Sequence, residues 1–231
     1  MPMNPKLAAL SYVALAAADT ALAARPGKGA RAARFVTKPL LMPALATAFV
    51  GATEGKGDLA RRTATAQAFS WGGDVALLGK GDTAFLAGLS SFFAGHLGYV
   101  GAFASARDRS LPALSPGVKA AGGVLATVAP VMAFAAGRQE PKLRAPVAAY
   151  SAVLASMFAA STRLDPNIPP RARRTIMAGT GLFLTSDTIL ATREFLVKEH
   201  SHALDAAVMA TYTAGQGLIA AGVAQAAAHS G

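Results

Sequence analysis

Three aspartates stand inside long apolar stretches of this sequence, and they are its strongest candidates for chemistry. They are Asp19, Asp74 and Asp187. A carboxylate within a membrane-spanning segment is costly unless it faces a polar cavity or a partner, so such residues are functional candidates by default. Two carboxylates that line one cavity can work together, one as an acid and the other as an anion.

Asp74 and Asp187 are the best candidates for such a pair. They stand in two predicted helices, 63–80 and 175–192, that run in the same direction. At about 1.5 Å per residue, they lie about 9 Å and about 7 Å from helix ends on the same side of the membrane. We therefore predict a shared site. The alternative is that each carboxylate caps or hydrogen-bonds a neighbouring helix independently.

Three further residues are predicted to form a wall above and beside the carboxylates, where they would bind substrate. Lys38 begins a helix on the same side, Tyr150 lies about one turn into another, and Tyr212 lies about 13 Å into the last. We predict that Lys38, with Arg34 or a neighbouring base, meets a phosphate. The alternative is a lysine that only extends its ammonium to the interface.

Three more substrate-binding candidates have weaker support. His96 and Gln216 fall about 20 Å from that side, so direct contact with both aspartates is not expected. Ser70 stands one turn before Asp74, but no Gly-x-Ser-x-Gly elbow supports a nucleophile. His200 and His202 have no matching third histidine, so we predict no metal ion and no other cofactor.

The elements that must position these residues are membrane-spanning helices. Of the 231 residues, 53% are hydrophobic and 15% are charged, too few to cover a soluble surface. The mean hydropathy is +0.39. We predict one domain, 1–231, that is an all-α bundle of eight transmembrane helices. The predicted helices are 7–24, 36–53, 63–80, 83–104, 117–136, 146–162, 175–192 and 203–226.

Charge and composition narrow the function further. The formal net charge is +10, but the basic residues stand between apolar blocks, which favours contact with anionic lipid over nucleic acid. They divide almost evenly between the two sides, so they do not set the orientation. The absence of Cys excludes disulfides, thiolate zinc sites and a Cys nucleophile. The first helix resembles a signal peptide, but Asp19 within it favours a retained helix. We expect a multi-pass protein of the cell membrane, with no indication of its oligomeric state.

A weak internal repeat accompanies these helices. Three pairs of segments match, namely 70–78 with 183–191, 94–96 with 214–216, and 45–49 with 154–158. A duplication of four helices would place two parallel copies in the chain. The alternative is chance similarity in an Ala-rich sequence.

Several short motifs together are specific, although each is modest alone. They are TKPLLMP (37–43), FSWGGD (69–74), FLAGL (85–89), GHLGY (95–99), GLFLTSD (181–187) and TY (211–212) with Gln216. In these motifs the chain resembles the lysoplasmalogenase family, also called YhhN-like, from the first predicted helix to the eighth.

The resemblance implies a membrane hydrolase that cleaves the vinyl ether bond of lysoplasmalogens. The products would be a fatty aldehyde and glycerophosphocholine or glycerophosphoethanolamine. Such hydrolysis protonates a carbon and leaves an oxocarbenium ion that water captures, so an acid and an anion are needed together. The expected partners are therefore a lysophospholipid and the bilayer, with Asp74 and Asp187 as catalytic residues in undecided roles.

Two other functions remain open at this point. In a proton-coupled transporter or a lipid-binding protein, the paired carboxylates would carry a proton or a cation without bond cleavage. In a metal-dependent lipid hydrolase, His96 and the two aspartates would have to converge on an ion.

Overall fold

The protein is an all-helical bundle, as predicted. The computed structural model describes residues 4–229, except for the side chain of Asp82. Its elements are α1 (Pro5–Ala23), α2 (Lys28–Thr53), α3 (Asp58–Ala76), α4 (Gly81–Ser105), α5 (Pro116–Gln139), the short 3-10 helix η1 (Pro141–Leu143), α6 (Arg144–Ser161), α7 (Pro170–Phe195) and α8 (His202–Ala227). The eight predicted helices are confirmed, and the described residues form no β-strand.

Six of these helices are long and apolar enough to cross a membrane. They are α1, α2, α4, α5, α6 with the preceding η1, and α8, which make the chain an integral membrane protein. α3 and α7 are more polar, because α3 begins with Asp58 and two arginines and α7 begins with three arginines. The two most polar helices are therefore the ones that carry Asp74 and Asp187.

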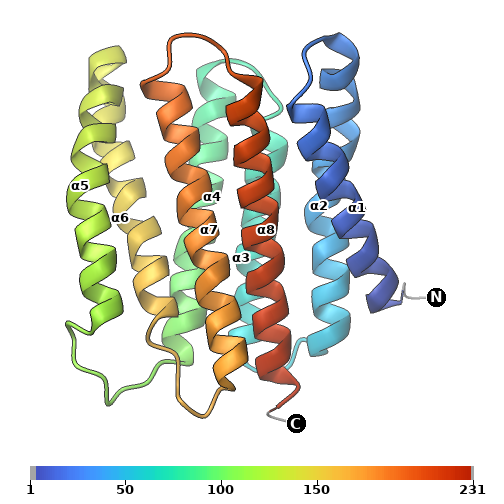
Figure 1. Ribbon diagram of the computed structural model, residues 1–231, viewed down its shortest axis with the longest axis vertical. Helices are drawn as coiled ribbons and strands as arrows, with labels where there is room; N and C mark the ends of the chain where they lie inside the picture. Colours follow the sequence, from blue (N-terminus) through green and yellow to red (C-terminus); the bar gives the residue numbers. More distant parts are fainter. Residues whose placement is uncertain (1–3, 230–231) are drawn as a thin grey trace.

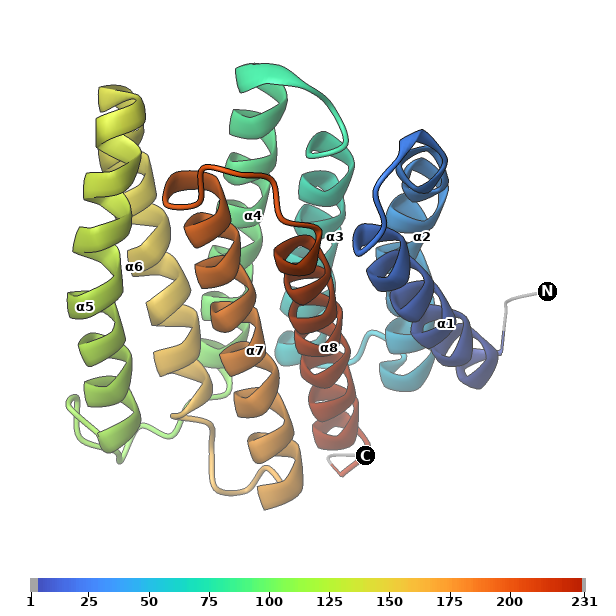
Figure 2. The same ribbon diagram turned by 45° about the horizontal axis from the view of Figure 1, so that its top comes forward.

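Seven helices form a closed ring, and α5 lies outside it (Figure 1). Around the ring, α1 packs on α2, then α3, α4, α6, α7 and α8 follow, and α8 packs back on α1. α5 packs on α6 and α7 only. Figure 2 shows α7 and α8 in front of α3 and α4, which brings both candidate aspartate helices to the centre.

Consecutive helices run in opposite directions, which fixes where the connections lie. The turns that join α1 to α2, α3 to α4, α5 to α6 and α7 to α8 lie at one end, called the upper end here (Figure 1). The start of α1 and the end of α8 lie toward the opposite end. An even number of helices places them there, as predicted.

The helix ends differ from the predicted ones at both aspartates. α3 ends at Ala76, because the turn to α4 needs Gly81 at a φ of +80°, a conformation that glycine adopts readily. α7 continues to Phe195. Asp74 is thus about 3 Å from the end of its helix and Asp187 about 12 Å from the end of its own. The predicted distances of about 9 Å and 7 Å are wrong.

Small residues bring α7 and α8 into close contact. A Cβ atom added to Gly179 would lie 2.8 Å from the carbonyl oxygen of Gly215, and one added to Gly215 would lie 2.9 Å from the carbonyl oxygen of Gly179. Backbones approach this closely only where no side chain intervenes. This contact holds Asp187 on α7 and Tyr212 on α8 at fixed positions relative to each other.

Candidate active site

A central cavity of about 880 Å³ lies at the upper end of the bundle. Both Asp74 and Asp187 line it. The polar side chains of Lys38, Tyr150 and Tyr212 line it as well, so five of the candidate residues share one space. They come from five different helices, α2, α3, α6, α7 and α8.

Asp74 is enclosed and both of its oxygens have partners. Its side chain is 1% exposed. The Tyr212 hydroxyl donates a hydrogen bond to Asp74 Oδ2 at 2.6 Å, and the Lys38 ammonium lies 3.5 Å from Asp74 Oδ1. Both oxygens of Asp74 are therefore engaged by groups of the protein itself.

A proline and a tryptophan explain why Lys38 reaches Asp74. Pro43 has no N–H, so the carbonyl of Pro39, one turn earlier, lacks a partner within α2. The indole Nε1 of Trp71 donates to that carbonyl at 2.9 Å. This bond joins α2 to α3 one residue beyond Lys38 and three residues before Asp74.

Asp187 is held through one oxygen only. Its Oδ2 atom accepts a hydrogen bond from the Tyr150 hydroxyl at 2.7 Å and lies 3.1 Å from His96 Nε2. Within the part of the chain that the structure describes, no partner of Asp187 Oδ1 is found. The side chain is 9% exposed and lines the cavity. One oxygen of Asp187 is therefore available to a molecule in the cavity.

His96 contacts one of the two carboxylates, Asp187, and contact with both was not expected. α4 and α7 run in opposite directions, and side chains on a helix lean toward its N-terminus. His96 therefore leans up from α4 while Asp187 leans down from α7, and they meet. His96 does not also contact Asp74, which binds Lys38 and Tyr212 instead.

The model of the YhhN family, the family of lysoplasmalogenases, matches residues 33–223. The chain belongs to the YhhN family. No curated protein and no solved structure matches it.

The YhhN family match covers every residue around the two carboxylates and omits α1. Asp19, on α1, has a different environment from the other two aspartates. It is fully buried, accepts three hydrogen bonds from Arg34 at 3.2 to 3.3 Å, and accepts a fourth from the Thr37 hydroxyl at 2.6 Å. Asp19 therefore joins α1 to α2.

Three of the candidate binding residues, Ser70, His96 and Gln216, do not line the central cavity. The Ser70 hydroxyl donates to the carbonyl of Ala66 in its own helix. Gln216 is fully buried, and its Oε1 accepts a hydrogen bond from the Tyr99 hydroxyl. The structure thus separates Ser70 and Gln216 from the five residues that line the cavity.

The partners of the two carboxylates follow a crossed pattern. One partner comes from the same half of the chain, Lys38 of α2 for Asp74 and Tyr150 of α6 for Asp187. The other comes from the opposite half, a tyrosine of α8 for Asp74 and a histidine of α4 for Asp187. Duplicated halves related by a twofold axis would produce this pattern, although the duplication itself stays a prediction.

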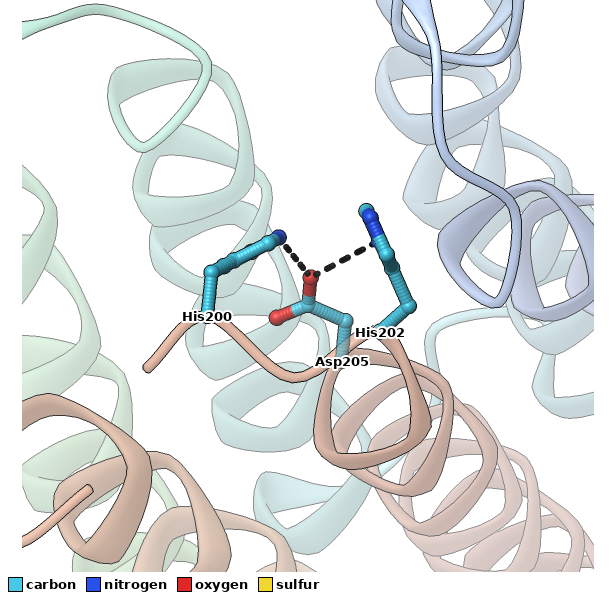
Figure 3. Close-up of side chains that lie close together, drawn as sticks. All are labelled: His200, His202 and Asp205. Carbon is cyan, nitrogen blue, oxygen red and sulfur yellow. Dashed lines mark ion pairs between the residues drawn. The ribbon is translucent and has the colours of Figure 1, made fainter. Parts of the chain in front are cut away.

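The one group that could hold a metal ion, within the described residues, lies away from the carboxylate pair. His200, His202 and Asp205 place their ligand atoms within 4.8 Å of one another (Figure 3). Arg193 already binds Asp205 Oδ1 at 2.5 Å. A guanidinium at this carboxylate opposes a cation there, so the group does not fit a metal site well.

The sequence reasoning missed Arg193 and Asp205. Arg193 stands near the end of α7 and Asp205 in the first turn of α8, and both line the central cavity. The sequence does carry a signal for this pair: Asp205 stands in the first turn of an apolar helix, and Arg193 stands in the last turn of the helix before it. Such a pair across a short turn predicts an ion pair.

Proposed function

We propose that this YhhN-family protein hydrolyses the vinyl ether bond of lysoplasmalogens, with a fatty aldehyde and glycerophosphocholine or glycerophosphoethanolamine as products. The observation that supports it most is a pair of carboxylates in different environments on one cavity. Asp74 lies beside an ammonium, whereas Asp187 has one free oxygen. Family membership supports the same class of reaction.

The reaction needs a proton donor at carbon. A protonated Asp187 Oδ1 transfers its proton to the vinyl carbon remote from the ether oxygen, and the carbon attached to oxygen becomes an oxocarbenium ion. Water adds to that carbon and returns one proton to Asp187, and the hemiacetal then breaks its bond to the glycerol oxygen. The glycerol oxygen leaves with a proton, and the fatty chain leaves as an aldehyde, so one water is consumed.

The two carboxylates have separate roles in this scheme. Asp187 is the general acid, because its oxygen is open to the cavity and its other oxygen is fixed by Tyr150 and His96. Asp74, held beside Lys38, is the carboxylate that stabilises the developing positive charge. Glycosidases that pass through a similar cation also use two carboxyl groups in different environments.

The experiment is an assay of purified protein in lipid nanodiscs. A lysoplasmalogen is supplied beside the corresponding acyl lysophospholipid, and both vinyl ether loss and aldehyde formation are measured. The proposal expects aldehyde from the vinyl ether lipid only, in equal amount to the lipid lost. If no aldehyde forms and the lipid stays intact, a transporter or a lipid-binding protein would be the better interpretation.

A further inference from the structure

A narrow apolar slot adjoins the central cavity on the side of α5. It has a volume of about 80 Å³ and is enclosed mainly by α4, α5, α6 and α7. Apolar side chains from all four helices line it, including Phe85, Leu89, Val128, Met132, Leu154 and Leu184. Tyr150 and Asp187 line both the slot and the central cavity. Asp187 therefore stands where the space changes from polar to apolar.

Two arginines also line the central cavity. Arg34 and Arg193 line this cavity and also a second one of about 800 Å³ beside it. Each guanidinium is fixed by a buried carboxylate, Arg34 by Asp19 and Arg193 by Asp205, and Arg193 also lies 3.4 Å from Glu194 Oε2. Their side chains are still 23% and 27% exposed, so N–H groups remain for an anion.

We propose that the lipid lies across this boundary, with its phosphate at Arg34 and Arg193 and the beginning of its alkenyl chain in the apolar slot. In a lysoplasmalogen the vinyl ether is itself the junction between the polar glycerophosphate and the apolar chain. That orientation brings the vinyl ether to Asp187. The inference rests on the proposed function and adds the binding orientation of the substrate.

A second apolar groove gives a comparison within the same molecule. It has a volume of about 1000 Å³ and lies between α1, α2 and α8. Neither Asp74 nor Asp187 lines it. A chain bound in this groove would not present its first carbons to either carboxylate, although the groove is larger than the slot.

The chain end of the proposal is tested with Ala129→Phe, which fills the slot from α5. Its matched control is Ala48→Phe, because Ala48 lines the second groove and both alanines are 9% exposed. We expect Ala129→Phe to lower kcat/KM at least about tenfold for a long-chain lysoplasmalogen and less than about twofold for a butenyl analogue. Equal losses for both chain lengths, or a chain-selective loss in Ala48→Phe, would overturn the proposal.

The phosphate end is tested with Arg193→Gln and a substrate that lacks phosphate, 1-alkenylglycerol. The expected result is a kcat/KM at least about tenfold lower for the lysoplasmalogen, with little change for the alkenylglycerol. A loss of the same size for both substrates would mean that Arg193 acts on the structure alone, and the phosphate position would be withdrawn.

Binding separates failure of this inference from failure of the proposed function. The probe is a lysophosphocholine with a saturated ether chain, which has no vinyl ether to cleave. Weaker probe binding in Ala129→Phe, unmatched by Ala48→Phe, supports the orientation even if no lipid is hydrolysed. If Ala129→Phe binds the probe as tightly as the wild type does, and the wild type hydrolyses lysoplasmalogens, the orientation is refuted and the proposed function stands.

Discussion

The two aspartates differ in how fully their oxygens are engaged, and the first prediction follows from this difference. Asp187→Asn removes the proton donor and Asp74→Asn removes the carboxylate that stabilises the cation, while both keep the side-chain shape. General acid–base assistance contributes about 10² to 10⁴ in rate and electrostatic stabilisation about 10² to 10³, so each variant should lose at least about a hundredfold in kcat. Aldehyde release measures this loss, and size-exclusion chromatography in detergent checks folding.

Asp58→Asn is the matched control for this test. Asp58 is on the same helix as Asp74, but its side chain is 61% exposed and pairs with Arg61. It should retain near-normal activity. A loss of only a few-fold in Asp74→Asn or Asp187→Asn would remove that residue from the mechanism.

Lys38 allows a sharper test, because its two interpretations predict different kinetics. Lys38 lies 3.5 Å from Asp74, so Lys38→Gln should leave this buried carboxylate without its cation and lower kcat at least about tenfold. A lysine that binds the substrate phosphate would instead mainly raise KM. Lys80→Gln, an exposed lysine at the same end of the bundle, is the control.

The histidines near the upper end test the metal-dependent alternative. His200→Ala combined with His202→Ala removes two of the three groups that could hold an ion. Because Asp205 stays paired with Arg193, we expect hydrolysis within about twofold of wild type. Hydrolysis should also survive treatment with a strong chelator. Loss of activity in both experiments would favour the metal-dependent hydrolase.

Among the helices, the contact between α3 and α4 is the one that most directly shapes the site. A Cβ atom added to Gly73 would lie 2.5 Å from two ring carbons of Phe92, which packs edge-on against Tyr212. Gly73→Ala should therefore lower the free energy of unfolding by about 1–3 kcal/mol, which is seen as a lower melting temperature. Activity should fall too, because Tyr212 holds Asp74.

Gly123→Ala provides the comparison for that measurement. Gly123 is in the middle of α5, and an added Cβ would meet nothing within 4 Å. Alanine favours a helix over glycine by about 1 kcal/mol, so this variant should be neutral or slightly more stable. Equal melting temperatures for the two variants would contradict the packing argument for Gly73.

Helices were predictable here because apolar blocks of the length of a bilayer repeat along the chain. The ends of the helices were less predictable. Leu77 and Leu78 continue the apolar pattern of α3 beyond Ala76, whereas the turn that needs Gly81 stops the helix. Counting residues from helix ends also cannot show which way a side chain leans. Depth alone therefore left open whether His96 meets Asp187.

In the molecule as a whole, the carboxylate pair depends on helices from both halves of the chain. No local motif shows that His96 pairs with Asp187 or that Tyr212 pairs with Asp74, because each pair joins the two halves of the chain. The sequence could identify both aspartates, since charge inside an apolar block is visible without a structure. It could not assign their partners, because these depend on the ring in which seven helices close.

The arrangement of the whole bundle makes a final prediction about the membrane. Eight antiparallel helices place the start of α1 and the end of α8 together, opposite the turn that joins α3 to α4. Reporters fused before α1 and after α8 should therefore appear on one side, and a reporter inserted at Lys80 on the other. The Lys80 reporter also marks the side of the central cavity, since Gly79 and Gly81 line it. Terminal reporters on opposite sides would mean that one of the eight helices does not cross, with the polar α3 and α7 the first to examine.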